Sequence, residues 1–248
     1  MTRISVELVP RDVEVLKEEV KTIKEKLSDV DFINIPDLLS CDTRSWDGAN
    51  IAKAYFDDVV PHLRAMDFDF TKELPIKDKL REYNIKEVLV IEGDPPQSML
   101  YQVYPTISTD IIKKFSEEMP EITVYAGIDQ YRSSMKEEEY RIRRKQLAGA
   151  KGFFTQPFFD MRYLEMYADL LDGLDIYWGV SPVLSERSVS YWRNKNNVIF
   201  PKDFKPTLEW NIEFARKVID FARKHNHNVY LMPIKAKIMP YLEGVFAK

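Results

Sequence analysis

Short apolar runs recur at regular intervals along the sequence and constrain its fold more than any other feature. They have the length and composition of buried parallel strands. The runs cover residues 4–9, 32–36, 62–68, 87–93, 122–128, 152–159, 175–182 and 229–234. Helix-like segments separate them, and strict alternation of strand and helix favours an α/β fold, a (β/α)8 TIM barrel. A doubly wound open sheet produces the same local signals and is the alternative.

The connecting segments show the three-and-four spacing of amphipathic helices. In the first connection this apolar face consists of Val13, Leu16, Val20, Ile23 and Leu27. The last long connection repeats the pattern after Thr207, a plausible N-cap, with Leu208, Ile212, Ala215, Ile219 and Ala222. The connection between the seventh and eighth runs is the longest. It contains residues 197–201 and two prolines, which predict a loop or a lid before the final helix.

Length and charge narrow the class of protein. A chain of 248 residues fits one barrel, and we predict a single catalytic domain over 1–248. The net charge of -4 gives no general attraction to nucleic acid or to anionic lipid. Cys41 is the only cysteine, and no apolar stretch has the length of a membrane helix. We therefore expect a soluble, cytoplasmic protein that binds neither nucleic acid nor membrane.

Four polar side chains lie where the strands of a barrel would end, which is where ligands bind in this fold. Glu7 lies within the first run, Asp94 and Asp129 follow the fourth and fifth, and Gln156 interrupts the sixth. A single carboxylate in a strand most often has a structural hydrogen-bonding role. Two such groups at one end of a barrel favour a binding site instead.

Other kinds of site lack support. The three histidines show no metal-ligand spacing, so no metal is expected, and Cys41 has no identifiable catalytic histidine partner. The chain has no Gly-rich dinucleotide loop, phosphate-binding loop or nucleophile elbow.

A series of motifs in order resembles the methylenetetrahydrofolate reductase family. The motifs are ISVE (4–7), VVPHL (59–63), IEGDPP (91–96), RRKQLAGAKGFFTQPFFD (143–160) and GVSPVLS (179–185). The likeness extends over nearly the whole chain, and FFTQPFFD after AGA is its most specific part. The resemblance implies a barrel oxidoreductase of one-carbon metabolism. Such a flavoprotein uses FAD to pass hydride from NAD(P)H to a 5,10-methylene-tetrahydropterin and forms the 5-methyl product.

The resemblance also implies roles for individual residues. Glu7 matches the general acid and Asp94 a catalytic, substrate-binding aspartate beside the flavin and the pterin. Gln156 matches the glutamine that holds the pterin, and Trp192 occupies the position of a stacking phenylalanine. These roles agree with the chemistry: a carboxyl in an apolar strand can keep its proton near neutral pH, and Asp and Gln can pair with a pterin edge.

The flavin site is only partly preserved. The residues that match FAD contacts are His62, Gly93, Arg144 and Lys145, although Arg144 also fits ordinary surface charge. Glu92 stands where the family usually has an arginine before the Gly-Asp pair, and residues 127–129 replace a Tyr-Pro-Glu-like segment. A carboxylate near an anionic cofactor predicts weak FAD binding.

Three hypotheses follow. The first is reduction of a methylene-pterin by hydride transfer. The second is a flavin-free protein that binds a pterin for methyl transfer or handling. The third is a non-catalytic subunit that needs a partner. The sequence does not distinguish a tetrahydrofolate substrate from a methanopterin-like one, or NADH from NADPH as the hydride donor. It also leaves open whether the chain forms a homo-oligomer or works with a redox partner subunit.

Overall fold

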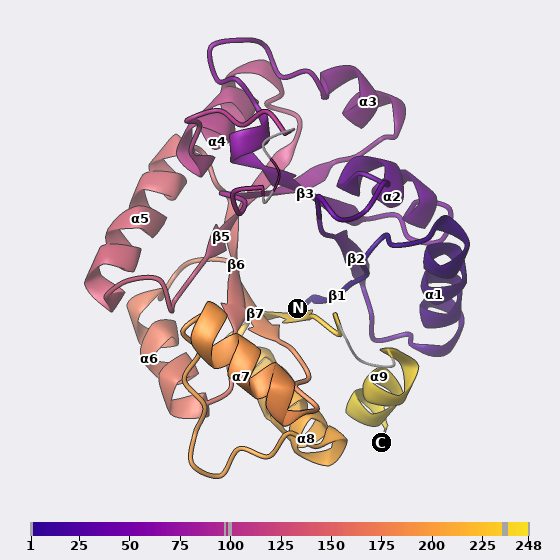
Figure 1. Cartoon of the computed structure of the whole chain (residues 1–248), viewed down its shortest axis with the longest axis vertical. Coiled ribbons are helices and arrows are strands. Elements are labelled where there is room, and N and C mark those ends of the chain that lie inside the picture. The colour runs from indigo at the N-terminus through magenta and orange to yellow at the C-terminus, as the bar shows by residue number, and fades with distance from the viewer. Residues whose placement is uncertain (1, 97, 99–100, 235–237, 248) are drawn as a thin grey trace.

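The predicted barrel is confirmed by the computed structural model, which describes residues 2–96, 98, 101–234 and 238–247 (Figure 1). Its parallel strands are β1 (Ile4–Glu7), β2 (Phe32–Ile35), β3 (Val59–Arg64), β4 (Glu87–Ile91), β5 (Thr123–Ile128), β6 (Gly152–Pro157), β7 (Ile176–Val180) and β8 (Asn228–Leu231). Each strand hydrogen-bonds to the next, and β8 pairs with β1. This closure overturns the open-sheet alternative.

Helices surround the strands on the outside of the barrel (Figure 1). They are α1 (Val13–Lys26), α2 (Ser45–Ala52), α3 (Lys77–Glu82), α4 (Ser108–Glu118), α5 (Met135–Ala148), α6 (Met161–Leu170), α7 (Glu186–Lys195), α8 (Leu208–His225) and α9 (Ile238–Phe246), with a 3-10 turn at Ala65–Asp67. The long connection after β7 therefore holds two helices. Thr207 caps α8 as predicted, because its side chain accepts a hydrogen bond from the Trp210 amide.

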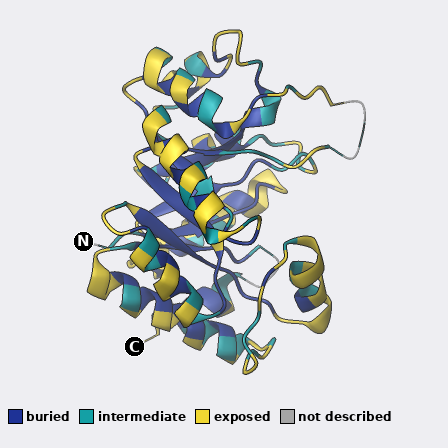
Figure 2. Ribbon diagram, turned by 90° about the vertical axis from the view of Figure 1, so that its left-hand side faces the viewer, coloured by how far each residue is buried: buried dark blue, intermediate teal, exposed yellow. Residues whose placement is uncertain are grey.

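The main core lies between the strands and the helices. Leu16, Val20 and Ile23 of α1 are fully buried there, whereas Val13, predicted on the same face, is 38% exposed because it begins the helix. Figure 2 shows the buried strands at the centre and exposed residues on the outer helix faces. The apolar stripe of each helix thus holds it on the barrel.

A second core fills the inside of the barrel with aromatic side chains. Phe154 and Tyr177 stack with ring centroids 4.1 Å apart. The Arg3 guanidinium closes the amino-terminal end, where it lies 4.4 Å from the centre of the Phe32 ring and hydrogen-bonds to Glu87. The interior is therefore packed at this end, and space for a ligand lies at the carboxyl ends of the strands.

No helix in the described part of the chain is long and apolar enough to cross a membrane.

Candidate functional site

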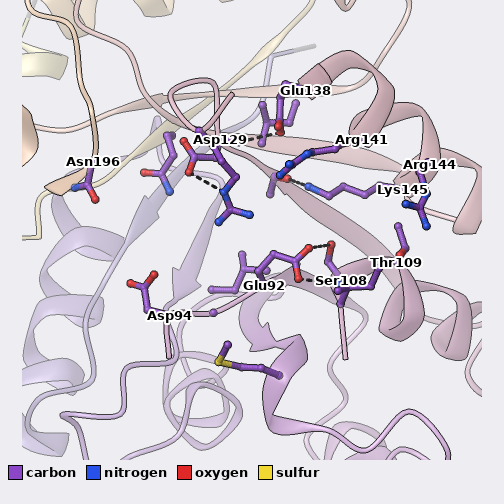
Figure 3. A pocket seen from close by; sticks show the side chains of 18 of the residues that line it. Glu92, Asp94, Ser108, Thr109, Asp129, Glu138, Arg141, Arg144, Lys145 and Asn196 are labelled. Carbon is purple, nitrogen blue, oxygen red and sulfur yellow. Dashed lines mark hydrogen bonds and ion pairs between the residues drawn. The ribbon is translucent and has the colours of Figure 1, made fainter. Parts of the chain in front are cut away.

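A cavity of about 700 Å³ opens at the carboxyl ends of β4, β5 and β6 (Figure 3). Its walls come from the turn after β4, the start of α4, the turn after β5 and one face of α5. Of the four polar residues predicted at strand ends, Asp94, Asp129 and Gln156 line it together. A volume of this size suits one drug-sized ligand or cofactor, for which pockets of roughly 300–1,000 Å³ are usual.

The turn after β4 supplies Gly93 and Asp94. Gly93 has φ of +87°, and a Cβ atom there would lie 3.1 Å from Cβ of Arg64. Arg64 is buried at the end of β3, and its Nη2 donates a 2.8 Å hydrogen bond to the Asp94 carbonyl. The left-handed turn, held by Arg64, leaves the Asp94 side chain exposed at the cavity.

Glu92, which precedes this turn, is bound to the beginning of α4. Its Oε1 accepts a 2.7 Å hydrogen bond from the Ser108 hydroxyl, and its Oε2 accepts one of 3.1 Å from the Ser108 amide (Figure 3). The N-cap residue, Ile107, makes no side-chain cap. Glu92 therefore satisfies a free amide of the first turn and places a negative charge at the positive end of the helix.

Gln156 reaches the cavity through an irregularity in the sheet. The pairing of β6 with β7 shifts between Phe154 and Pro157, where the Thr155 hydroxyl accepts a 2.8 Å hydrogen bond from the Gly179 amide. The Gln156 side chain is exposed, while its carbonyl accepts a hydrogen bond from Gln130. Such bulges often redirect a side chain next to a site.

One face of α5 forms a basic wall of the cavity, with Arg141, Arg144 and Lys145 within two turns (Figure 3). Arg144 is exposed, and Lys145 is buried with its Nζ 2.6 Å from the Gly127 carbonyl. Burial lowers the pKa of Lys145. The sequence predicted Arg144 and Lys145 but missed Arg141, although its position one turn before them was the available signal.

Acidic groups of the cavity balance this basic wall. Glu138 is almost fully buried, and burial raises its pKa. Its Oε1 accepts a hydrogen bond from the Asp129 amide, whereas its Oε2 has no hydrogen-bond partner within the described residues. Asp129 forms an ion pair of 3.6 Å with Arg132. The Oε2 atom of Glu138 is itself buried, so it lies beneath the cavity surface.

Glu7 does not line this cavity but lies inside the barrel, at the carboxyl end of β1. It is 6% exposed, accepts a hydrogen bond from the Tyr230 hydroxyl, and its Oε2 is 4.0 Å from Nδ1 of His62. Burial raises the pKa of Glu7 to about 8 and lowers the pKa of His62 to about 3. At neutral pH the carboxyl is thus protonated and the imidazole neutral, so they do not form an ion pair.

The two remaining predicted residues, His62 and Trp192, lie outside the cavity and apart from one another. His62 is buried beside Glu7 and Asn34 rather than in the cavity wall, with its Nε2 3.3 Å from Asn34 Oδ1. Trp192 of α7 packs against Phe159 in an apolar cluster with Phe200 and Phe204, and it does not line the cavity. Its stacking on a ligand stays a prediction. Asn196, at the end of the same helix, does line the cavity.

The residues present do not fit the diphosphate of FAD. A diphosphate is favoured at a helix N-terminus, but the start of α4 already binds the Glu92 carboxylate. Asp94, Asp129 and Glu138 add further acidic groups to the cavity, so its basic side chains face about as many acidic ones. Among the described residues, no group of three or more His, Cys, Asp or Glu is placed to hold a metal ion.

Comparisons with known proteins agree with the motifs of the sequence. No family model matches the chain. A 5,10-methylenetetrahydrofolate reductase from Buchnera aphidicola subsp. Schizaphis graminum is 22% identical over 147 residues, which are 57% of this chain and 50% of that protein. The match therefore spans about half the length of this curated relative.

Solved structures show the same fold at low sequence identity. A protein from Clostridium thermocellum that binds two copies of 5-methyl-5,6,7,8-tetrahydrofolic acid has a TM-score of 0.65 and 13% identity, covering 98% of this chain and 94% of that one. An oxaloacetate acetylhydrolase has a TM-score of 0.62 and 9% identity, covering 96% and 77%. Such structural likeness shows the fold alone. With the shared motifs and the curated match, the chain is a divergent protein similar to methylenetetrahydrofolate reductase.

Proposed function

We propose that this chain binds a reduced, folate-like pterin carrying a one-carbon unit at the carboxyl ends of its strands. The observation that carries the proposal is the meeting of Asp94 and Gln156 in one cavity. A pterin edge presents amino and amide groups, with which a carboxylate and a side-chain amide pair in fixed geometry. The binding of 5-methyl-tetrahydrofolic acid by the structurally similar Clostridium protein supports the same ligand class.

The acidic groups of the cavity also suit a pterin. Its ring N–H and amino groups are hydrogen-bond donors, and the exposed Asp94 carboxylate offers an acceptor at the cavity surface. The basic side chains of α5 suit the carboxylates of a carrier's tail. Both tetrahydrofolate and a methanopterin-like carrier fit this description.

Titration calorimetry with 5-methyl-tetrahydrofolate tests the binding proposal. We expect saturable binding of the pterin and much weaker binding of p-aminobenzoylglutamate, which carries the tail without the pterin ring. Equal binding of both compounds, or of neither, would remove the pterin from the proposal.

The reaction that these residues suit best is reduction of a 5,10-methylene-tetrahydropterin. Opening the five-membered ring breaks the bond between N10 and the methylene carbon, and the departing nitrogen needs a proton. Glu7 is protonated at neutral pH, because burial raises its pKa to about 8, and it is our candidate for this acid. Since Glu7 lies at the carboxyl end of β1 and outside the cavity wall, this role requires the pterin to extend from the cavity across the barrel end toward β1. Hydride from NAD(P)H, direct or through a redox partner, then adds to the methylene carbon and completes the 5-methyl group.

A second candidate function is supported by the Glu92 contact with α4, which opposes binding of an anionic flavin. In this case the chain binds the methyl-pterin without redox chemistry, for methyl transfer or as the non-catalytic partner of a reducing subunit. Single-turnover assays with methylene-tetrahydrofolate and NAD(P)H separate the two functions. Formation of 5-methyl product by the chain alone supports the reductase, and product only after addition of a co-purifying subunit supports the second function.

A further inference from the structure

The Glu92 carboxylate occupies the N-terminus of α4, a part of the cavity wall where a helix could otherwise receive an anion. Both of its oxygens hydrogen-bond to Ser108, the first residue of α4, at 2.7 and 3.1 Å. Ile107, Ser108 and Thr109 all line the cavity, so the beginning of this helix of 11 residues faces the ligand space. Amide groups there and the helix dipole would otherwise attract a phosphate.

The surroundings of Glu92 hold charges of both signs, because Lys145 of α5, on the same cavity, interacts electrostatically with Glu92. Asp94 lies two residues further along the same turn, on the same cavity. Arg64, at the end of β3, is bound to Asp67 and to the Asp94 carbonyl, and the Lys145 ammonium donates to the Gly127 carbonyl. A diphosphate approaching α4 would therefore meet a carboxylate that is held in place by two hydrogen bonds.

We infer that Glu92 is a specificity-determining residue that closes the α4 terminus to diphosphate cofactors and keeps the cavity for ligands with hydrogen-bond donors. This role deepens the proposed function, because it concerns the same cavity, but it does not depend on pterin binding. It also separates two effects of the carboxylate. As a cap, Glu92 stabilises the helix through its hydrogen bonds and its charge, whereas it excludes a diphosphate through its charge alone.

The variant Glu92→Gln removes the negative charge, while its single amide oxygen can still accept one of the two Ser108 hydrogen bonds. The probes are FAD, ADP and riboflavin, and binding is measured by calorimetry and by quenching of flavin fluorescence. Removing a like charge next to a phosphate should tighten binding of FAD and ADP by about 10-fold or more. Riboflavin has no phosphate, so its affinity should not change.

A matched control is Glu117→Gln on the same helix. Glu117 is 60% exposed, pairs with Lys113 and does not line the cavity, so this variant changes the net charge equally without changing the site. Its FAD affinity should equal that of the unmodified chain. Circular dichroism of each variant checks that the fold is kept, and Glu92→Asn serves as the second neutral variant if Glu92→Gln does not fold.

Three outcomes would overturn the inference. They are unchanged FAD and ADP affinity in a folded neutral variant, an equal gain for riboflavin, and tight stoichiometric FAD binding by the unmodified chain. Calorimetry with 5-methyl-tetrahydrofolate is done on the same samples. If the unmodified chain does not bind 5-methyl-tetrahydrofolate, the proposed function is wrong, but the result for Glu92 still stands.

Discussion

Tyr230 of β8 donates its hydroxyl hydrogen bond to Glu7 of β1 across the seam that closes the barrel. These residues are 223 positions apart in the sequence, and strand pairing brings them together. His62 from β3 completes a buried group in which the Glu7 carboxyl has a pKa raised to about 8 and the imidazole a pKa lowered to about 3. The Glu7 carboxyl, at the carboxyl end of β1, is therefore protonated at neutral pH.

The first prediction concerns stability and pH. Because the folded pKa of Glu7 lies above its ordinary value of 4.5, its contribution to the free energy of unfolding falls as pH rises from 4.5 to about 8. His62 acts in the opposite sense, and its contribution increases from pH 3 to 6.5. Above pH 6.5 we therefore expect the chain to lose about 2 kcal/mol of stability by pH 8 through Glu7.

Urea denaturation at a series of pH values measures this effect. Glu7→Gln should remove the loss above pH 6.5, whereas His62→Gln should keep that loss and flatten the gain at lower pH. An unchanged pH profile in Glu7→Gln would show that the carboxyl is ionised in the folded chain.

The second prediction concerns the chemical role of Glu7. Glu7→Gln keeps the shape of the side chain and removes the transferable proton, so single-turnover formation of 5-methyl product should slow by about 10²–10⁴-fold. In the unmodified chain this rate should decrease above a pH of about 8, where the carboxyl ionises. Stopped-flow or quenched-flow measurement gives both results. A folded Glu7→Gln variant with the original rate would leave Glu7 a structural role only.

The third prediction concerns the pterin contacts. Gln156→Ala should weaken binding of 5-methyl-tetrahydrofolate about 10-fold or more, because an unpaired polar group of the ligand costs roughly 1–3 kcal/mol. Gln146→Ala is the matched control, since Gln146 is an exposed glutamine of α5 that does not line the cavity. Titration calorimetry on both variants decides the matter. Equal affinities would mean that the pterin does not contact Gln156.

The strands were predictable because buried parallel strands appear in the sequence as apolar runs. The third run was displaced: residues 62–68 were predicted, but β3 is Val59–Arg64. Pro61 argues against a strand in sequence reasoning, and Ala65–Asp67 forms a 3-10 turn instead.

The site was predictable only in part. Asp94 and Gln156 follow from position at strand ends, together with the family motifs. The Glu92 contact with Ser108 and the Tyr230 contact with Glu7 depend on how separate elements pack, so neither appears in a local pattern. Arg64 was also missed, although it is two residues after His62 and therefore on the same face of its strand.

The last prediction concerns Gly93, whose φ of +87° places it in the left-handed region. A Cβ atom there would lie 3.1 Å from Cβ and 3.3 Å from Nε of Arg64, which holds the Asp94 carbonyl. Gly173 offers a matched control, because it has φ of +78° and a Cβ atom would meet nothing within 4 Å. Replacement by alanine should destabilise both variants by about 1–2 kcal/mol through the backbone conformation.

Only Gly93→Ala should also move Arg64 and misplace Asp94, so it alone should weaken binding of 5-methyl-tetrahydrofolate. Thermal unfolding and calorimetry on the two alanine variants separate the backbone effect, which they share, from the effect on the site. If Gly173→Ala lost pterin affinity to the same extent, the loss would reflect general destabilisation. If neither variant lost affinity, the turn after β4 would not position Asp94 for the ligand.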